Sequence, residues 1–167
     1  DVYKRQLGER CVEVYDGVTA HTPVEKVQEA AYRLEAIEAD AIISIGGGSA
    51  IDTAKGCNFL YTNGGKIQDY WGVGKASKPM LPLIAIPTTA GTGSETQSFA
   101  LISDAQTHVK MACGDLKARF RTVILDPSLI ESVPQNVIAA TGIDAIAHAI
   151  ESYVSTKRNP VSQMFAQ

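Results

Sequence analysis

The sequence predicts an α/β fold built on an open parallel sheet, and three observations support this class. Two short apolar segments, residues 41–45 and 81–86, each run directly into a turn rich in glycine, serine or threonine. Segments with the apolar spacing of helices lie on either side of the first one. Residues 41–45 show no polar alternation, which is typical of a parallel strand covered by helices on both faces. Ligands of such sheets bind at the carboxyl ends of strands, so the two turns predict one crevice.

Composition excludes several classes of function. The chain has 167 residues, 45% hydrophobic and 20% charged, which suits one soluble globular core. A net charge of -3 with scattered lysines and arginines argues against nucleic acid as a partner. We find neither an apolar run of membrane-spanning length nor a secretory signal pattern, so no membrane contact and a cytoplasmic location are expected. The three cysteines are far apart and are expected to be buried, reduced thiols.

The first part of the chain predicts a strand and a helix. Residues 1–6 fit no periodic pattern and are given no role in the fold. Alternation over residues 11–15 predicts a short strand. Thr22 precedes a proline and lies three residues before Glu25, a capping box that predicts a helix from here to about residue 38.

The middle of the chain continues the α/β pattern. After the strand at 41–45, a helix is expected to begin near Ser49 and to end before the turn at 61–65. The polar, glycine-bearing stretch that follows, up to Pro79, is expected to be an irregular loop. A second strand is then predicted over residues 81–86.

The remaining elements are a hairpin and helices. Residues 98–103 and 108–113 flank a short polar turn and predict a β-hairpin. Residues 122–125 predict a short strand. From Pro134 onward the composition favours helix, and a further helix is expected to start at Asn159.

The glycine turn at residues 46–49 has the build of a phosphate cradle. Glycines let backbone N–H groups approach an anion, and the helix N-terminus adds partial positive charge. Neither G-x-G-x-x-G nor G-x-x-x-x-G-K-[ST] is present, so a tight turn without a ligand is an equally open interpretation. Asp52 suits the helix dipole without any ligand. Likewise, Lys55 and Lys110 could simply be solvated charges.

Asp144 and His148 lie four residues apart on a predicted helix, so their side chains share one face. A carboxylate and an imidazole at this spacing suit a divalent transition metal. Two ligands do not complete a site, and a local hydrogen bond between them is the alternative. His21 and His108 are expected to be surface residues. The threonines of the second turn could simply satisfy turn amides.

Three motifs together resemble one family. They are residues 45–55 (IGGGSAIDTAK), 86–95 (IPTTAGTGSE) and 141–153 (TGIDAIAHAIESY). In this order and spacing the chain resembles the iron-containing (group III) alcohol dehydrogenases from about residue 11 to its end. The resemblance implies a Rossmann-like dinucleotide-binding domain over residues 1–133, incomplete at its N-terminus. An all-helical metal-binding domain would begin within residues 134–167 and be truncated.

The resemblance also implies roles for residues. Gly47, Gly48 and Ser49 would hold the pyrophosphate, and Asp52 would lie near the nicotinamide. The remaining cofactor contacts would be Thr88, Thr89, Thr92, Phe99, Lys110 and Leu129. Asp144 and His148 would be the first two of four metal ligands and so belong to the catalytic centre, with the other two supplied by histidines beyond this chain.

The implied activity is hydride transfer between a small alcohol or aldehyde and NAD or NADP, with Fe²⁺ as Lewis acid and Zn²⁺ as the other candidate metal. We expect the chain to be an internal fragment, inactive in isolation, of an enzyme that forms a homo-oligomer. Three alternatives stay open: a zinc-dependent relative such as glycerol dehydrogenase, a dehydroquinate synthase, or a dinucleotide-binding module without catalysis.

Overall fold

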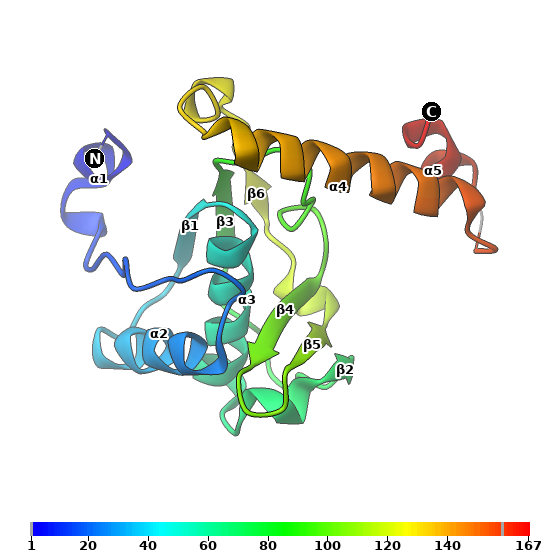
Figure 1. Cartoon of the computed structure of the whole chain (residues 1–167). Helices are drawn as coiled ribbons and strands as arrows, with labels where there is room; N and C mark the ends of the chain where they lie inside the picture. Colours follow the sequence, from blue (N-terminus) through cyan, green and yellow to red (C-terminus); the bar gives the residue numbers. More distant parts are fainter. Residues whose placement is uncertain (1, 158) are drawn as a thin grey trace.

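The computed structural model describes residues 2–157 and 159–167. Its first sheet has the order β1-β3-β6 and is parallel throughout. The strands are β1 (Ile42–Gly46), β3 (Leu83–Pro87) and β6 (Thr122–Val123). All three therefore end at the same edge, and the predicted α/β class with a parallel sheet is confirmed (Figure 1).

The second sheet has the order β2-β5-β4. Strands β4 (Phe99–Asp104) and β5 (Val109–Gly114) form the predicted antiparallel hairpin. Strand β2 (Gly72–Val73) pairs in parallel with β5 and follows the short 3₁₀ helix η2 (Ile67–Tyr70). Both lie in the stretch expected to be an irregular loop, so that expectation was wrong in part: buried Ile67 and Tyr70 attach it to the core.

Helix α3 (Gly48–Asn63) contacts both sheets and is the centre of the fold (Figure 1). Residues 51–60 are buried without interruption, polar side chains included. Helix α2 (Val24–Ala36) packs on it closely at Gly56. A Cβ atom on Gly56 would lie 2.9 Å from Val27 and 2.8 Å from Ile102, so glycine permits this approach. The buried cluster around it includes Val27, Phe59, Ile67, Ile102, Met111 and Cys113.

Strand β1 is covered on one face only. Ser44 is buried, whereas the alternate residues Ile43 and Ile45 are 37% and 46% exposed. The expectation of helices on both faces is therefore wrong for β1. The burial of β1 alternates although its sequence does not, because α3 contacts the sheet on one side while a hollow separates the other side from the N-terminal segment. Strand β3, flanked by β1 and β6, is more fully buried.

Two predictions near the N-terminus were wrong. Residues 11–15 belong to no strand among the residues described, because no neighbouring strand pairs with them. Thr22 does not cap α2: it has a φ of +48°, and its hydroxyl donates to the Ser49 carbonyl at 3.3 Å while Pro23 occupies the N-cap. Residues 2–6, which were given no role, lie in helix α1 (Val2–Leu7), and the 3₁₀ turn η1 (Gly8–Arg10) follows it.

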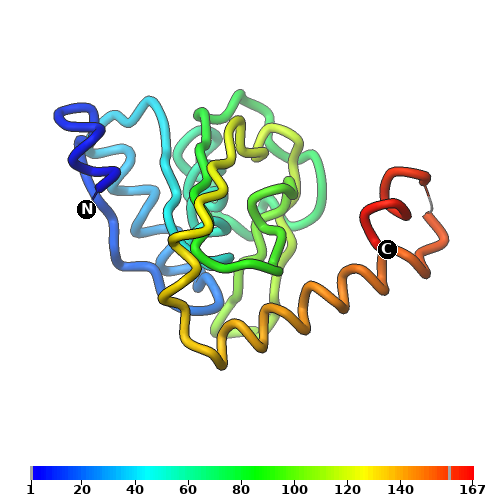
Figure 2. Tube along the Cα trace, turned by 90° about the horizontal axis from the view of Figure 1, so that it is seen from above, coloured from blue at the N-terminus to red at the C-terminus, as the bar shows by residue number. Residues whose placement is uncertain are grey.

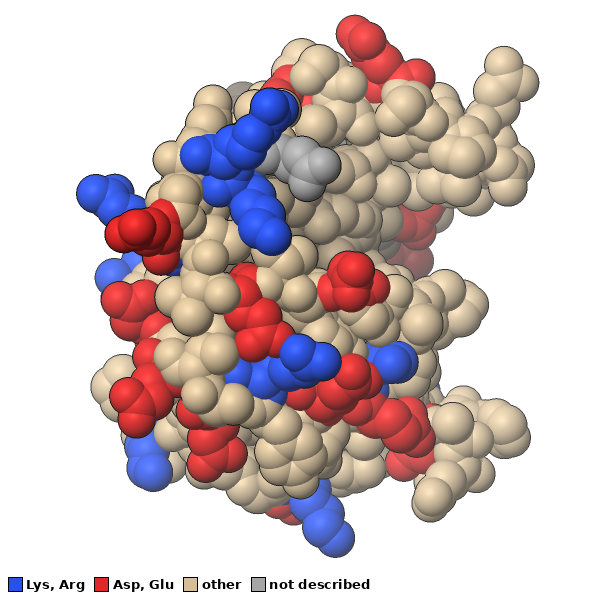
Figure 3. All heavy atoms as spheres, turned by 90° about the vertical axis from the view of Figure 1, so that its left-hand side faces the viewer, with Lys and Arg blue, Asp and Glu red and all other residues tan. Residues whose placement is uncertain are grey.

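The cysteines are free, as predicted. Cys57 and Cys113 are buried, and burial raises the pKa of their thiols to about 12 and about 11. Cys11 is only partly buried. On the face of the molecule in Figure 3, a few lysines and arginines gather near the top, and elsewhere they lie among aspartates and glutamates.

The last two helices are α4 (Gln135–Val154) and α5 (Pro160–Phe165), the latter capped by the Asn159 side chain as its sequence suggests. Helix α4 crosses the carboxyl edge of the parallel sheet and then runs away from the body towards α5 (Figures 1 and 2). None of its residues is buried, and its isoleucines are largely exposed. By length and composition alone α4 could cross a membrane, which corrects the expectation that no such segment exists.

Candidate active site

The glycine turn (residues 46–49) joins β1 to α3 at the carboxyl edge of the parallel sheet. Gly46 has a φ of +153°, and a Cβ atom there would lie 2.6 Å from that of Ala50, so the chain can turn this tightly only with glycine. Gly47 is the N-cap of α3, with an extended backbone. The Thr88 amide donates to the Gly46 carbonyl at 3.0 Å, which ties the end of β3 to the turn.

The threonine loop (residues 88–98) connects β3 to β4 and faces the glycine turn. A Cβ atom on Gly47 would lie 3.2 Å from the hydroxyl oxygen of Thr89. One on Gly48 would lie 3.2 Å from Ser94 Oγ and 3.4 Å from Thr92 Oγ1. The missing side chains thus leave a cradle bordered by hydroxyl groups and by the first turn of α3, whose N–H groups lack partners within the helix. This set of donors fits an anionic phosphate group.

Ser49 and Asp52 follow on the first turns of α3. The Ser49 carbonyl accepts hydrogen bonds from Thr53 Oγ1 at 2.7 Å and from Thr22. Asp52 is 5% exposed. Burial raises the pKa of its carboxyl to about 6, and the nearby charges of Lys55 and Lys110 act in the opposite direction.

The interpretation of Lys55 as a solvated charge does not hold, because its side chain has no exposed surface. Its Nζ atom donates to the carbonyls of Ser94 and Phe99, both at 2.6 Å. Burial lowers the pKa of this ammonium, and Asp52 Oδ1 at 3.4 Å counteracts the shift. The sequence offered one signal for this burial: Lys55 lies four residues after the core residue Ile51 and therefore on the same helix face.

The other expected cofactor residues lie on separate elements. Phe99 begins β4, with its ring against Gly114 of β5. Lys110 is exposed on β5, opposite Ser103. Leu129 is partly buried on the 3₁₀ turn η4 (Pro127–Leu129), which follows β6. The structure thus places the threonine loop directly against the glycine turn. The link of Lys110 to this region is electrostatic, because its positive charge lowers the pKa of Asp52.

Asp144 and His148 lie on α4 where this helix crosses the threonine loop. Asp144 Oδ1 is 3.8 Å from His148 Nε2, and His148 Nδ1 is 3.3 Å from the Gly91 carbonyl oxygen. A carbonyl can only accept, so this contact fits the tautomer that carries its proton on Nδ1 and has Nε2 available to a metal. That is the tautomer a metal would need.

The donor set fits part of a metal site. An imidazole and a carboxylate suit a divalent transition metal, and the two side chains are 50% and 46% exposed. Within residues 2–157 and 159–167, however, no three histidine, cysteine, aspartate or glutamate side chains gather closely enough to bind a metal. The described residues therefore offer two donors here, fewer than the protein ligands that a metal centre requires.

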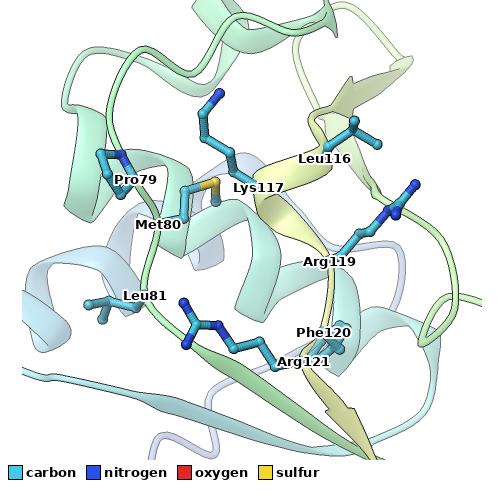
Figure 4. A pocket seen from close by; sticks show the side chains of 8 residues that line it. All are labelled: Pro79, Met80, Leu81, Leu116, Lys117, Arg119, Phe120 and Arg121. Atoms are coloured by element: carbon cyan, nitrogen blue, oxygen red, sulfur yellow. The ribbon is translucent and has the colours of Figure 1, made fainter.

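Two hollows elsewhere do not include the candidate site. One, of about 600 Å³, lies between the N-terminal segment, α2 and β1. The other, of about 420 Å³, lies beside the start of β3, where Lys117 and Arg119 point in different directions (Figure 4). Neither is lined by the glycine turn, the threonine loop or Asp144.

Fold and site together define a Rossmann-like α/β protein with a glycine turn and a threonine loop at one sheet edge, overlaid by a helix with a carboxylate–imidazole pair. The sequence model of the family described as "Iron-containing alcohol dehydrogenase" matches residues 2–127. The chain belongs to this family.

Individual relatives agree. Alcohol dehydrogenase 4 of Schizosaccharomyces pombe is 46% identical over 99% of this chain and 40% of its own length. NAD-dependent methanol dehydrogenase of Bacillus methanolicus is 50% identical over 76% of this chain and 33% of its own length. The solved alcohol dehydrogenase from Oenococcus oeni superimposes with a TM-score of 0.88 at 38% identity, covering 92% of this chain and 40% of that one. The chain thus spans less than half the length of these relatives.

Proposed function

We propose that this chain contributes the dinucleotide cleft, and the first part of the metal centre, to an alcohol dehydrogenase that uses NAD or NADP. The observation that carries the proposal is the meeting of the glycine turn, the threonine loop and the Asp144–His148 face of α4 at one sheet edge. Family membership supports it, and so does the NAD-dependent methanol dehydrogenase among the relatives.

In this proposal, Gly47, Gly48 and Ser49 bind the pyrophosphate, because the glycines leave the space and α3 supplies N–H groups. Thr88, Thr89 and Thr92 line the opposite side with hydroxyl groups. Asp52 and Phe99 lie towards the nicotinamide. Lys110 and Leu129 complete the contacts from β5 and η4. When bound, the nicotinamide supplies the hydride acceptor.

Asp144 and His148 are proposed as two metal ligands and as catalytic residues. Fe²⁺ is the proposed metal and Zn²⁺ the competing one. When bound, the metal supplies Lewis-acid polarisation of the alcohol. The contribution of this chain is to hold both donors on one helix face, with the Gly91 carbonyl fixing the imidazole. Residues beyond this chain would supply the other ligands.

We further propose that the chain is part of a longer, homo-oligomeric, cytoplasmic enzyme, since it spans 40% of its yeast relative. Residues 1–133 would form the dinucleotide-binding domain and residues 134–167 the start of the helical domain. The isolated chain would then bind dinucleotide without turning over alcohol.

The test compares residues 1–167 with the full-length parent protein. NAD and NADP are titrated into each, with and without Fe²⁺ or Zn²⁺, and turnover of a panel of small alcohols is followed by dinucleotide absorbance. The proposal expects binding by both proteins and metal-dependent turnover by the parent alone. A parent that binds dinucleotide but oxidises no alcohol would favour a binding module instead. Turnover by the isolated chain would refute the expected incompleteness of its metal centre.

A further inference from the structure

Lys55 is a fully buried cation that the proposed chemistry does not use. Its side chain extends from α3 into the space between this helix and the chain that links the two sheets. Its three possible donors meet three acceptors: the Ser94 carbonyl, the Phe99 carbonyl and Asp52 Oδ1. The Phe120 ring centroid lies 5.7 Å from Nζ. The ammonium group is therefore saturated by its surroundings.

Two of these acceptors belong to the segment that forms the cofactor side of the candidate site. Ser94 lies in the threonine loop, with its own hydroxyl at the position nearest to a Gly48 side chain. Phe99 is the first residue of β4 and is expected to flank the nicotinamide. Lys55 thus holds both ends of residues 94–99 against the helix that begins at the glycine turn.

Stability alone does not explain a lysine here. Replacing a whole buried ion pair by apolar residues of similar volume is often neutral or stabilising, so the buried Asp52–Lys55 pair is weak evidence for a purely stabilising role. Charge-assisted hydrogen bonds, by contrast, fix the distance and direction of the groups they join. A backbone loop facing a ligand gains most from such a constraint, because its own side chains stay free for contacts.

We propose that Lys55 is a positioning residue for dinucleotide binding: its ammonium group fixes residues 94–99 against α3 and so sets the spacing between the glycine turn and the threonine loop. The inference rests on the proposed function, because it concerns the same cleft. It assigns a role to a residue that need not touch the cofactor.

Asn58 offers a matched control on the same helix. It too has no exposed surface, and its side chain makes two hydrogen bonds of 3.0 Å to the backbone of Leu81. These bonds join α3 to the chain just before β3, which is the opposite end of that strand from the threonine loop. Asn58→Leu removes a buried side chain–backbone tie of comparable kind without touching the proposed cleft.

The experiment introduces Lys55→Met and Asn58→Leu separately into the full-length parent. Melting temperature, the Kd for NAD, the KM values for NAD and alcohol, and kcat are measured. Loss of a charge-assisted positioning contact should raise the Kd and KM for NAD by about tenfold or more in Lys55→Met, with a smaller change in the KM for alcohol. Asn58→Leu should lower the melting temperature and leave the Kd for NAD within about twofold of the parent, since it perturbs only the remote end of the strand.

A folded Lys55→Met protein with the parent's Kd would overturn the inference, and so would an equal rise in Kd for Asn58→Leu. Parent protein that binds no dinucleotide would overturn the proposed function itself, which separates the two failures. If Lys55→Met does not fold, Lys55→Gln, which keeps a donor, takes its place.

If neither Lys55 variant folds, amide hydrogen exchange of the parent protein with and without NAD tests the inference. The inference expects NAD to protect the amides of residues 48–56 and 94–100 together. Protection confined to residues 48–56 would contradict it.

Discussion

His148 Nδ1 lies 3.3 Å from the carbonyl oxygen of Gly91, and this contact seats α4 on the threonine loop. Gly91 itself has a φ of +118°, and a Cβ atom there would collide with the Thr141 carbonyl oxygen of α4. One glycine therefore provides both the close approach of the helix and the acceptor that orients the imidazole. This relationship connects the proposed metal ligands to the proposed cofactor cleft.

Gly91→Ala should displace α4. The new methyl group meets backbone rather than a flexible side chain, so the helix must move. Gly64→Ala is the matched control, because Gly64 also has a positive φ of +76° but open space around it. We expect the control to cost about 1–3 kcal/mol from backbone strain, because its ψ of -160° places it in a region that is essentially restricted to glycine. Gly91→Ala should cost at least about 1 kcal/mol more from the clash, measured by urea unfolding. Equal losses for the two variants would contradict the close packing.

Asp144→Ala and His148→Ala, each in the full-length parent, should abolish metal-dependent turnover. Each change removes one of the two adjacent donor side chains, so the affinity of the protein for the metal should fall. Dinucleotide binding should persist, because neither residue belongs to the glycine turn or the threonine loop. Metal content by elemental analysis and NAD titration check the two halves of this prediction. Unchanged metal content and turnover in both variants would remove these residues from the metal centre.

Gly47→Ala should weaken dinucleotide binding without straining the backbone. Gly47 has a φ of -79° and a ψ of -171°, a conformation that any residue adopts. The added methyl group would fill the space beside Thr89. We expect the Kd for NAD to rise about tenfold. Gly142→Ala on α4, where a Cβ atom meets nothing within 4 Å, should leave the Kd unchanged. An unaltered Kd for Gly47→Ala would place the pyrophosphate elsewhere.

Asp52 should make the fold less stable as pH rises. Burial raises the pKa of its carboxyl from 3.8 to about 6, so the folded state favours the protonated form. That contribution is complete below about pH 4 and is lost as pH rises through 6. Relative to Asp52→Asn, the wild-type chain should lose up to about 3 kcal/mol between pH 4 and pH 7. Urea unfolding at several pH values measures this difference.

Asp115→Asn provides a control of opposite sign. Burial opposes ionisation of Asp115, but the bonds it accepts from the Lys117 and Ala76 amides prevail and lower its pKa. Its stabilisation should therefore disappear as pH falls, not as it rises. Matching pH slopes for the two aspartates would contradict both assignments.

Sequence patterns predicted the elements whose structure depends mainly on neighbouring residues. The isoleucine-rich strand β1, the glycine turn and the start of α3 lie where the sequence suggested, as does the hairpin of β4 and β5. The strand expected at residues 11–15 failed because a strand needs a neighbour to accept its hydrogen bonds, and alternation alone does not supply one. Thr22 has the right chemistry for a cap but bonds instead to Ser49, 27 residues away.

The candidate site likewise combines features that one helix determines with features that depend on contacts between distant segments. The spacing of Asp144 and His148 could be read directly, because one helix carries both. Their position over Gly91 depends on a fold contact across 57 residues, which no local pattern encodes. The burial of Lys55 was missed because lysine is rarely buried, and it becomes possible only where the threonine loop and the start of β4 bring two carbonyls to its ammonium group.

The open side of β1 has a practical consequence for anyone producing this chain alone. Within the described residues β1 pairs only with β3, so its other edge presents unpaired backbone groups beside exposed Ile43 and Ile45. An apolar edge of this kind is a template for strand pairing between molecules. Concentrated solutions of the isolated chain should therefore form intermolecular β-sheet, and a lysine at position 43 or 45 would act as a gatekeeper against it.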